Sequence, residues 1–144
     1  MTEASEDTAC NPIEAAARAL TCEFAAAGDV SGQIARLIDM GRAFDGLPDG
    51  DKNAVTRIHG CQSQLWLKAQ LNGQIMTFRA DSDSLVMRGL LAVILQIYEG
   101  KRPDQIVRHD SGAVDTLILT LAPSRASGLR SLKQRIRESA EAAL

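Results

Sequence analysis

Residues 54–80 read AVTRIHGCQSQLWLKAQLNGQIMTFRA, and this stretch decides the fold. Within it, three runs (54–59, 65–71 and 75–80) show an alternation with a period of two. Because that period places successive side chains on opposite faces of a β-strand, each run is predicted to be a strand. Asn72-Gly73, between the second and third runs, is a preferred type I′ hairpin dipeptide. The stretch therefore predicts a three-stranded antiparallel meander.

Two helices are predicted before these strands. Asn11-Pro12 is typical of a helix start, and the large apolar residues from Ile13 to Phe24 recur at helical spacing. A second helix is predicted over 31–44, and residues 45–53 are predicted to form a loop.

Helices are also predicted after the strands. The segment from about Ser84 to Glu99 is apolar nearly all round, so we expect this helix in the middle of the core. A short helix is expected over 102–107 and a long one from about Ser124, whereas the period of 114–121 is ambiguous. The fold class is therefore α+β, with the sheet packed by N- and C-terminal helices.

Composition limits the class of protein. The chain has 144 residues, of which 45% are hydrophobic and 24% charged, which is ordinary usage for one globular domain. Residues 1–11 are small, polar and acidic, so we expect a flexible tail before a single domain over 12–144. A net charge of -2 and 3% aromatic residues argue against nucleic acid as a partner.

A membrane location is also not expected. The longest apolar run, Leu90 to Ile97, is far shorter than the roughly 20 residues that cross a bilayer. The N-terminus lacks the positive charge and apolar segment of a signal peptide, so a cytoplasmic location is expected.

The cysteines are Cys10, Cys22 and Cys61, an odd number without CxxC spacing, which implies neither a disulfide framework nor a zinc site. Cys61 stands in the polar turn Gly60–Gln64 between two strand patterns, where a rigid sheet would present a nucleophile on a loop. The alternative is that Cys61 is a small buried hydrophobe, the commoner fate of a free cysteine. Spacing alone leaves both interpretations open.

Three ordered blocks of the sequence, 58–67, 80–92 and 121–129, resemble the signature segments of the SufE family, which includes the CsdE proteins. Gln33 to Gly41 with Leu47-Pro48 resembles a weaker segment of that family. The resemblance implies a SufE/IscU-like fold and a sulfur carrier for iron–sulfur cluster assembly. In such a carrier, Cys61 takes a persulfide from a cysteine desulfurase and stimulates its turnover.

The resemblance also implies partners. They are a desulfurase of the SufS/CsdA kind, which uses pyridoxal phosphate, and a downstream iron–sulfur scaffold complex. The chain itself is expected to need no cofactor or metal and to have no independent activity. Which desulfurase and which final acceptor are used, and whether the protein forms a homodimer, stay open.

Several residues are predicted to contact the partner, namely Gln62, Ser63, Gln64, Asp81, Asp83 and Arg125. For Asp81 and Asp83, capping of the following helix is the preferred explanation. For Arg125, at the start of the last helix, a surface ion pair is an equal alternative. His59 is predicted to be structural, with a role as a base as the alternative. Trp66 is predicted to lie on the face opposite Leu65 and Leu67 and to pack in the core, with cover of the sheet or a partner contact as the alternatives.

Two other functions are considered. An iron–sulfur scaffold of the IscU kind would need several ligands to converge on one site, with Cys22 and His59 joining Cys61. A thiol hydrolase or peroxidase would use Cys61 with His59 or His109, but no third, orienting residue can be named.

Overall fold

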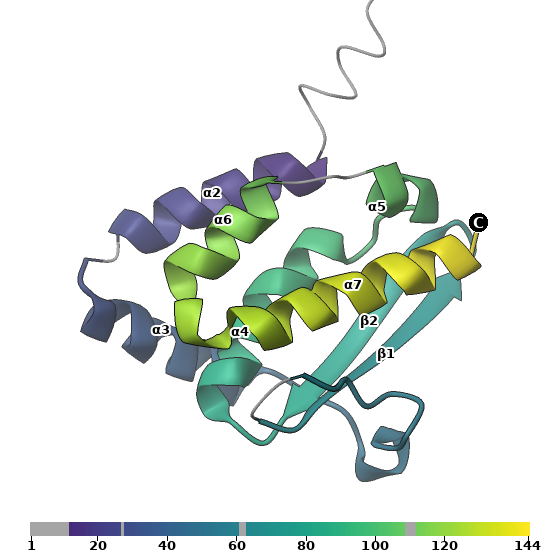
Figure 1. The fold of residues 1–144 in the computed structure, drawn as a ribbon, viewed down its shortest axis with the longest axis horizontal. Helices are drawn as coiled ribbons and strands as arrows, with labels where there is room; N and C mark the ends of the chain where they lie inside the picture. Colours follow the sequence, from purple (N-terminus) through teal and green to yellow (C-terminus); the bar gives the residue numbers. More distant parts are fainter. Residues whose placement is uncertain (1–11, 27, 61–62, 109–111) are drawn as a thin grey trace, which may run out of the picture.

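A computed structural model describes residues 12–26, 28–60, 63–108 and 112–144. The elements follow in this order (Figure 1): α2 (Pro12–Ala26), α3 (Val30–Ala43), the 3-10 turn η1 (Asp49–Asp51), β1 (Leu65–Asn72), β2 (Ile75–Ser82), α4 (Leu85–Tyr98), α5 (Pro103–Arg108), α6 (Gly112–Leu121), the 3-10 turn η2 (Pro123–Arg125) and α7 (Ala126–Ala142). The predicted helices are confirmed, and the ambiguous segment over 114–121 is helical. No described helix is long and apolar enough to cross a membrane.

The sheet differs from the prediction. β1 and β2 pair antiparallel from Leu65↔Ser82 to Asn72↔Ile75, and the described residues contain no third strand. The predicted strand over 54–59 is reduced to one isolated bridge, Arg57↔Trp66.

The cause of this difference is a turn that begins at Asn53. The Asn53 side chain accepts hydrogen bonds from the backbone N–H groups of Val55 (2.9 Å) and Thr56 (3.2 Å). Its carbonyl accepts one from the Arg57 N–H at 2.9 Å. These local bonds curl residues 53–57 out of the extended conformation, as Asn side chains do when they compete with a sheet ladder.

The hairpin turn also differs in detail. Asn72 pairs with Ile75, so Gly73 and Gln74 are the central residues. Gly73 has a φ of 65°, whereas no described residue other than glycine has a positive φ. A glycine at the first central position alone is typical of a type II′ turn, not of the type I′ turn predicted from Asn72-Gly73.

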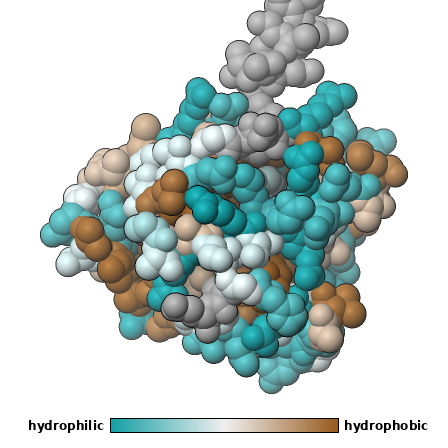
Figure 2. Space-filling model, viewed as in Figure 1, coloured by the Kyte–Doolittle hydropathy of each residue, from teal (hydrophilic) through white to brown (hydrophobic). Residues whose placement is uncertain are grey.

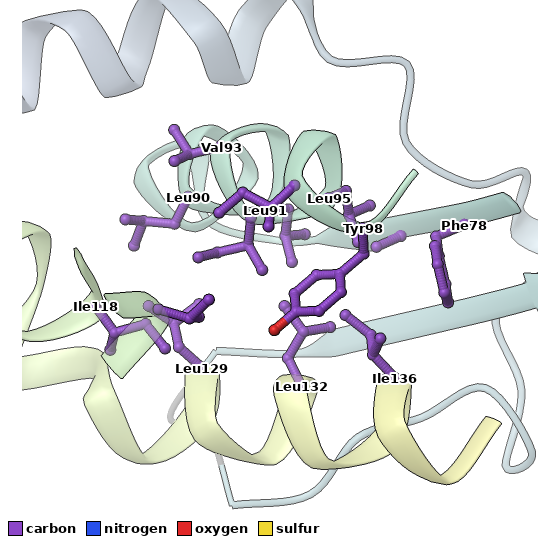
Figure 3. Packing of buried hydrophobic residues seen from close by; sticks show 14 of the residues in the cluster. Phe78, Leu90, Leu91, Val93, Leu95, Tyr98, Ile118, Leu129, Leu132 and Ile136 are labelled. Atoms are coloured by element: carbon purple, nitrogen blue, oxygen red, sulfur yellow. The ribbon is translucent and has the colours of Figure 1, made fainter. Parts of the chain in front are cut away.

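Helix α4 forms the centre of the core, as its all-round apolar sequence predicted. Nine of its 14 residues are buried. Figure 3 shows Leu90 and Leu91 of α4 facing α7, which contributes Leu129, Leu132 and Ile136. In Figure 1, α7 runs across α4 and the hairpin, while α2 lies beside α6. The helices thus cover the face of the sheet that carries the buried apolar side chains. The other face is more exposed, except at its Asp81 end, where the loop after α3 covers it.

Candidate functional site

The predicted nucleophile Cys61 and its neighbour Gln62 lie outside the described residues, as do Cys10 and His109. The chain is described on both sides of the cysteine, up to Gly60 and from Ser63 onward. The described part of the candidate site therefore consists of the residues that hold the chain just before and just after Cys61 and Gln62.

On the N-terminal side, Gly60 lies against the first turns of α7. Its φ of 91° is a left-handed conformation that favours glycine. The Ser127 hydroxyl donates to the Gly60 carbonyl at 3.3 Å. A Cβ added at Gly60 would lie 3.1 Å from the Ser131 Oγ, which is tight. The segment that leads into Cys61 is thus held beside the start of α7.

On the C-terminal side, the segment is held by Asp83. Its Oδ1 accepts a hydrogen bond from the backbone N–H of Gln64 at 3.0 Å. The N-cap of α4 is Ser84, whose hydroxyl accepts from the Met87 N–H at 3.3 Å. The prediction that Asp83 caps this helix is therefore wrong, because its carboxylate is directed to the cysteine segment.

Asp81 does not cap α4 either. It is 4% exposed and accepts hydrogen bonds from the backbone N–H groups of Leu47 (3.1 Å) and Ser82 (2.8 Å). It also forms ion pairs with Arg88 and with Lys52, the latter at 3.1 Å. The described side chain thus ties β2 to α4 and to the loop after α3, and it is not at the surface for the predicted partner contact.

The same contacts set the charge of Asp81. Burial disfavours its ionised form. The backbone N–H groups of Leu47 and Ser82, followed by Lys52 and Arg88, outweigh this effect and hold the pKa of Asp81 below its ordinary value. In return, the hydrogen bond to Asp81 raises the pKa of Lys52.

We expect Asp81→Asn to lower the free energy of unfolding at pH 7 by about 2 kcal/mol, because Arg88 and Lys52 lose their shared buried counter-ion. The folded pKa of Asp81 is depressed, so its stabilisation is present above the ordinary carboxyl pKa and is lost as the pH falls through the folded value. Urea unfolding between pH 7 and pH 3 should therefore show the difference from the parent protein shrinking below about pH 4.

The matched control is Asp49→Asn, because Asp49 pairs with the same Lys52 at 3.5 Å but its side chain is fully exposed. It should leave the free energy of unfolding nearly unchanged. An equal loss in both variants would mean that the buried network does not supply the stability.

Arg125 lies at the start of α7, two residues before Ser127, and is half-buried. No described residue forms a side-chain hydrogen bond or ion pair with its guanidinium group, so the predicted alternative of a surface ion pair finds no partner in this part of the chain. Arg125 therefore brings a positive charge to the end of α7 that holds Gly60.

A surface hollow of about 530 Å³ lies beside Gly60. It is lined by Ile58, His59, Ser127, Arg130, Ser131, Gln134, Arg135 and Glu138. His59 is exposed here. Among the described residues, no group of three His, Cys, Asp or Glu side chains is placed to hold a metal ion.

Comparison with known proteins identifies the family. Residues 18–140 match the family model described as "SufE: Fe-S metabolism associated domain". An uncharacterized SufE-like protein of Rhizobium meliloti is 35% identical over 116 residues, which cover 75% of this chain and 82% of that protein. This chain belongs to the SufE family. A second SufE-like relative, from Rhizobium etli, is 35% identical over 112 residues, which cover 73% of this chain and 76% of that protein.

The fold agrees with a distant solved structure. The solution structure of a hypothetical protein from Thermus thermophilus matches with a TM-score of 0.67 over 89% of this chain and 95% of that one, at 16% identity. The α+β arrangement is therefore shared with a protein of very different sequence. The association of the SufE family with iron–sulfur metabolism comes from the family match.

In this SufE-family chain, Arg135 has a role that the sequence did not indicate, and Trp66 differs from its preferred prediction. Arg135 donates to the carbonyls of Val55 and Arg57, both at 3.0 Å, and so fastens the segment before the cysteine to α7. Trp66 is half-buried, with the cations of Lys52 and Arg57 at 5.1 and 5.6 Å from its ring. The predicted core packing of Trp66 is wrong, because this side chain lies on the face of β1 opposite Leu65 and Leu67, where the two cations contact its ring.

Cys22 is exposed on α2. Because α2 packs against α6 and α4, this thiol is carried by a different part of the fold from Gly60 and Gln64. Nothing in the described residues links Cys22 to the cysteine segment.

Proposed function

We propose that this SufE-family protein accepts sulfur from a cysteine desulfurase onto Cys61 and carries it to iron–sulfur cluster assembly. The observation that carries the proposal is the anchoring of the chain around Cys61. Gly60 is bound by Ser127 of α7, and Gln64 is bound by Asp83 before α4. A short segment fixed at both ends on a rigid scaffold is suited to presenting one thiol to another protein.

The proposed reaction is a thiol–persulfide exchange. The Cys61 thiolate attacks the terminal sulfur of the desulfurase persulfide, the S–S bond of that persulfide breaks, and the desulfurase cysteine leaves as a thiolate. One sulfur atom moves to Cys61 and no external oxidant or reductant is needed. The rate depends on the thiolate fraction of Cys61 and on the access of the two sulfurs to each other.

The proposed partner is a desulfurase of the SufS/CsdA kind, which supplies the pyridoxal phosphate. Contact with it is assigned to the segment from Cys61 to Gln64, to Asp83 and to Arg125. The exposed Asp83 lies in the turn before α4 and binds Gln64, and Arg125 ends η2, two residues before the Ser127 that binds Gly60. A scaffold complex for cluster assembly is the proposed acceptor of the sulfur.

The proposal is tested by mass spectrometry of the full-length protein after incubation with desulfurase and cysteine. We expect one added sulfur, located on Cys61 and removed by a thiol reductant. A protein that gains no sulfur but binds iron would instead act as a scaffold of the IscU kind. A protein that turns over a thioester or peroxide without desulfurase would be a thiol enzyme.

A further inference from the structure

A cavity of about 390 Å³ lies between α5, α6 and α7, and the proposed sulfur transfer does not use it. Its inner wall is made by Tyr98 at the end of α4 and by Ile106 of α5, each only 2% exposed. Figure 3 shows the Tyr98 ring extending from α4 toward α7. A cavity of this volume is within the range of small-molecule sites.

The outer wall of the cavity is strongly cationic. Arg130, Lys133 and Arg137 of α7 line it, together with Asp115 of α6. Residues three and four apart share one face of a helix, so the three cations converge on the same space. Figure 2 shows hydrophilic side chains over much of the face that α7 crosses.

The charges of the described residues that line this cavity do not cancel. Lys133 pairs with Asp115 at 2.9 Å, and the described residues that line the cavity include no second carboxylate. No described residue forms an ion pair with Arg130 or Arg137. Three cations against one carboxylate leave an excess of two positive charges, although the whole chain has a net charge of -2. Neighbouring like charges on a helix repel, so a bound anion would stabilise this wall.

We propose that this cavity binds a small organic anion that carries phosphate or carboxylate groups. Guanidinium groups form paired hydrogen bonds with both kinds of oxyanion. Arg130 and Arg137 are seven residues apart, which is about 10 Å along an α-helix. An anion with two charged ends therefore fits between them, and the Tyr98 ring and Ile106 contact its uncharged part.

The proposal is tested by calorimetric titration of the full-length protein with fructose 1,6-bisphosphate, which carries a phosphate at each end of an uncharged carbon chain, and, separately, with citrate. Sodium chloride holds the ionic strength constant, so that general screening does not imitate binding. At least one of the two anions should bind with one-to-one stoichiometry, and the better one identifies the charged group. Arg137→Gln should weaken that binding about tenfold or more, because a charge-assisted hydrogen-bond donor is lost.

The matched control is Arg42→Gln, which removes the same charge from an exposed site on α3. It should bind the anion like the parent protein. Cys61→Ser should also bind normally, so this test is independent of the proposed sulfur transfer. The proposal is overturned if neither anion binds, if Arg137→Gln binds as tightly as the parent, or if Arg42→Gln weakens binding equally.

Discussion

Cys61→Ser is expected to abolish stimulation of the desulfurase while the protein stays folded. Serine has nearly the size of cysteine, but its hydroxyl cannot form the persulfide that drains the desulfurase. The substitution lies between two ends that other residues hold, since Gly60 and Gln64 are anchored through their backbones. Sulfide release by desulfurase with cysteine and a reductant measures the stimulation, and circular dichroism during heating measures the fold.

The control for this prediction is Cys22→Ser. Cys22 is exposed on α2, so its replacement should change neither the melting temperature nor the stimulation by much. Cys10→Ser should behave in the same way, because no signature residues surround Cys10 in the sequence. If Cys61→Ser stimulated the desulfurase like the parent, the proposed role of Cys61 would be wrong. A large loss in Cys22→Ser would indicate a sulfur relay or a cluster ligand.

The sequence predicted the parts of the fold that follow from the spacing of apolar residues along the chain. The helices follow from apolar spacing, and the central position of α4 follows from its lack of a polar face. The strand over 54–59 was predicted wrongly, because alternation does not reveal that the Asn53 side chain will bind the next backbone N–H groups. Local side-chain hydrogen bonds of this kind compete with strand pairing, and they leave no trace in the alternation of apolar and polar residues.

The site was harder to predict for a different reason. Asp81, Asp83 and Ser84 are all suitable helix caps, and only the three-dimensional arrangement shows that Ser84 has this role. Asp81 accepts a hydrogen bond from the backbone N–H of Leu47, 34 residues away, and Asp83 accepts one from the backbone N–H of Gln64, 19 residues away. Contacts at such separations leave no spacing pattern in a single sequence, and the same holds for Arg135, which binds the carbonyl of Arg57.

The block over 80–92 that resembles the SufE family contains a glycine with a clear physical role. Gly89 of α4 faces α3 so closely that a Cβ added there would lie 2.0 Å from the Leu37 carbonyl oxygen. From the other side, a Cβ at Gly41 would lie 2.2 Å from the Leu85 carbonyl oxygen. The two helices therefore touch along their backbones, where no flexible side chain can move aside. This contact fixes the start of α4, next to the Asp83 that holds the cysteine segment.

Gly89→Ala is therefore expected to lower the free energy of unfolding by about 3 kcal/mol or to prevent folding. Alanine is favoured over glycine in a helix by about 1 kcal/mol, but overpacking against a rigid backbone costs more than this gain. Gly50→Ala is the control, because a Cβ there meets nothing within 4 Å, and its stability should change little. Urea unfolding of both variants measures the two effects. If Gly89→Ala were as stable as the parent, α3 and α4 would have to separate at little cost, and their backbone contact would not be the rigid one that these distances imply.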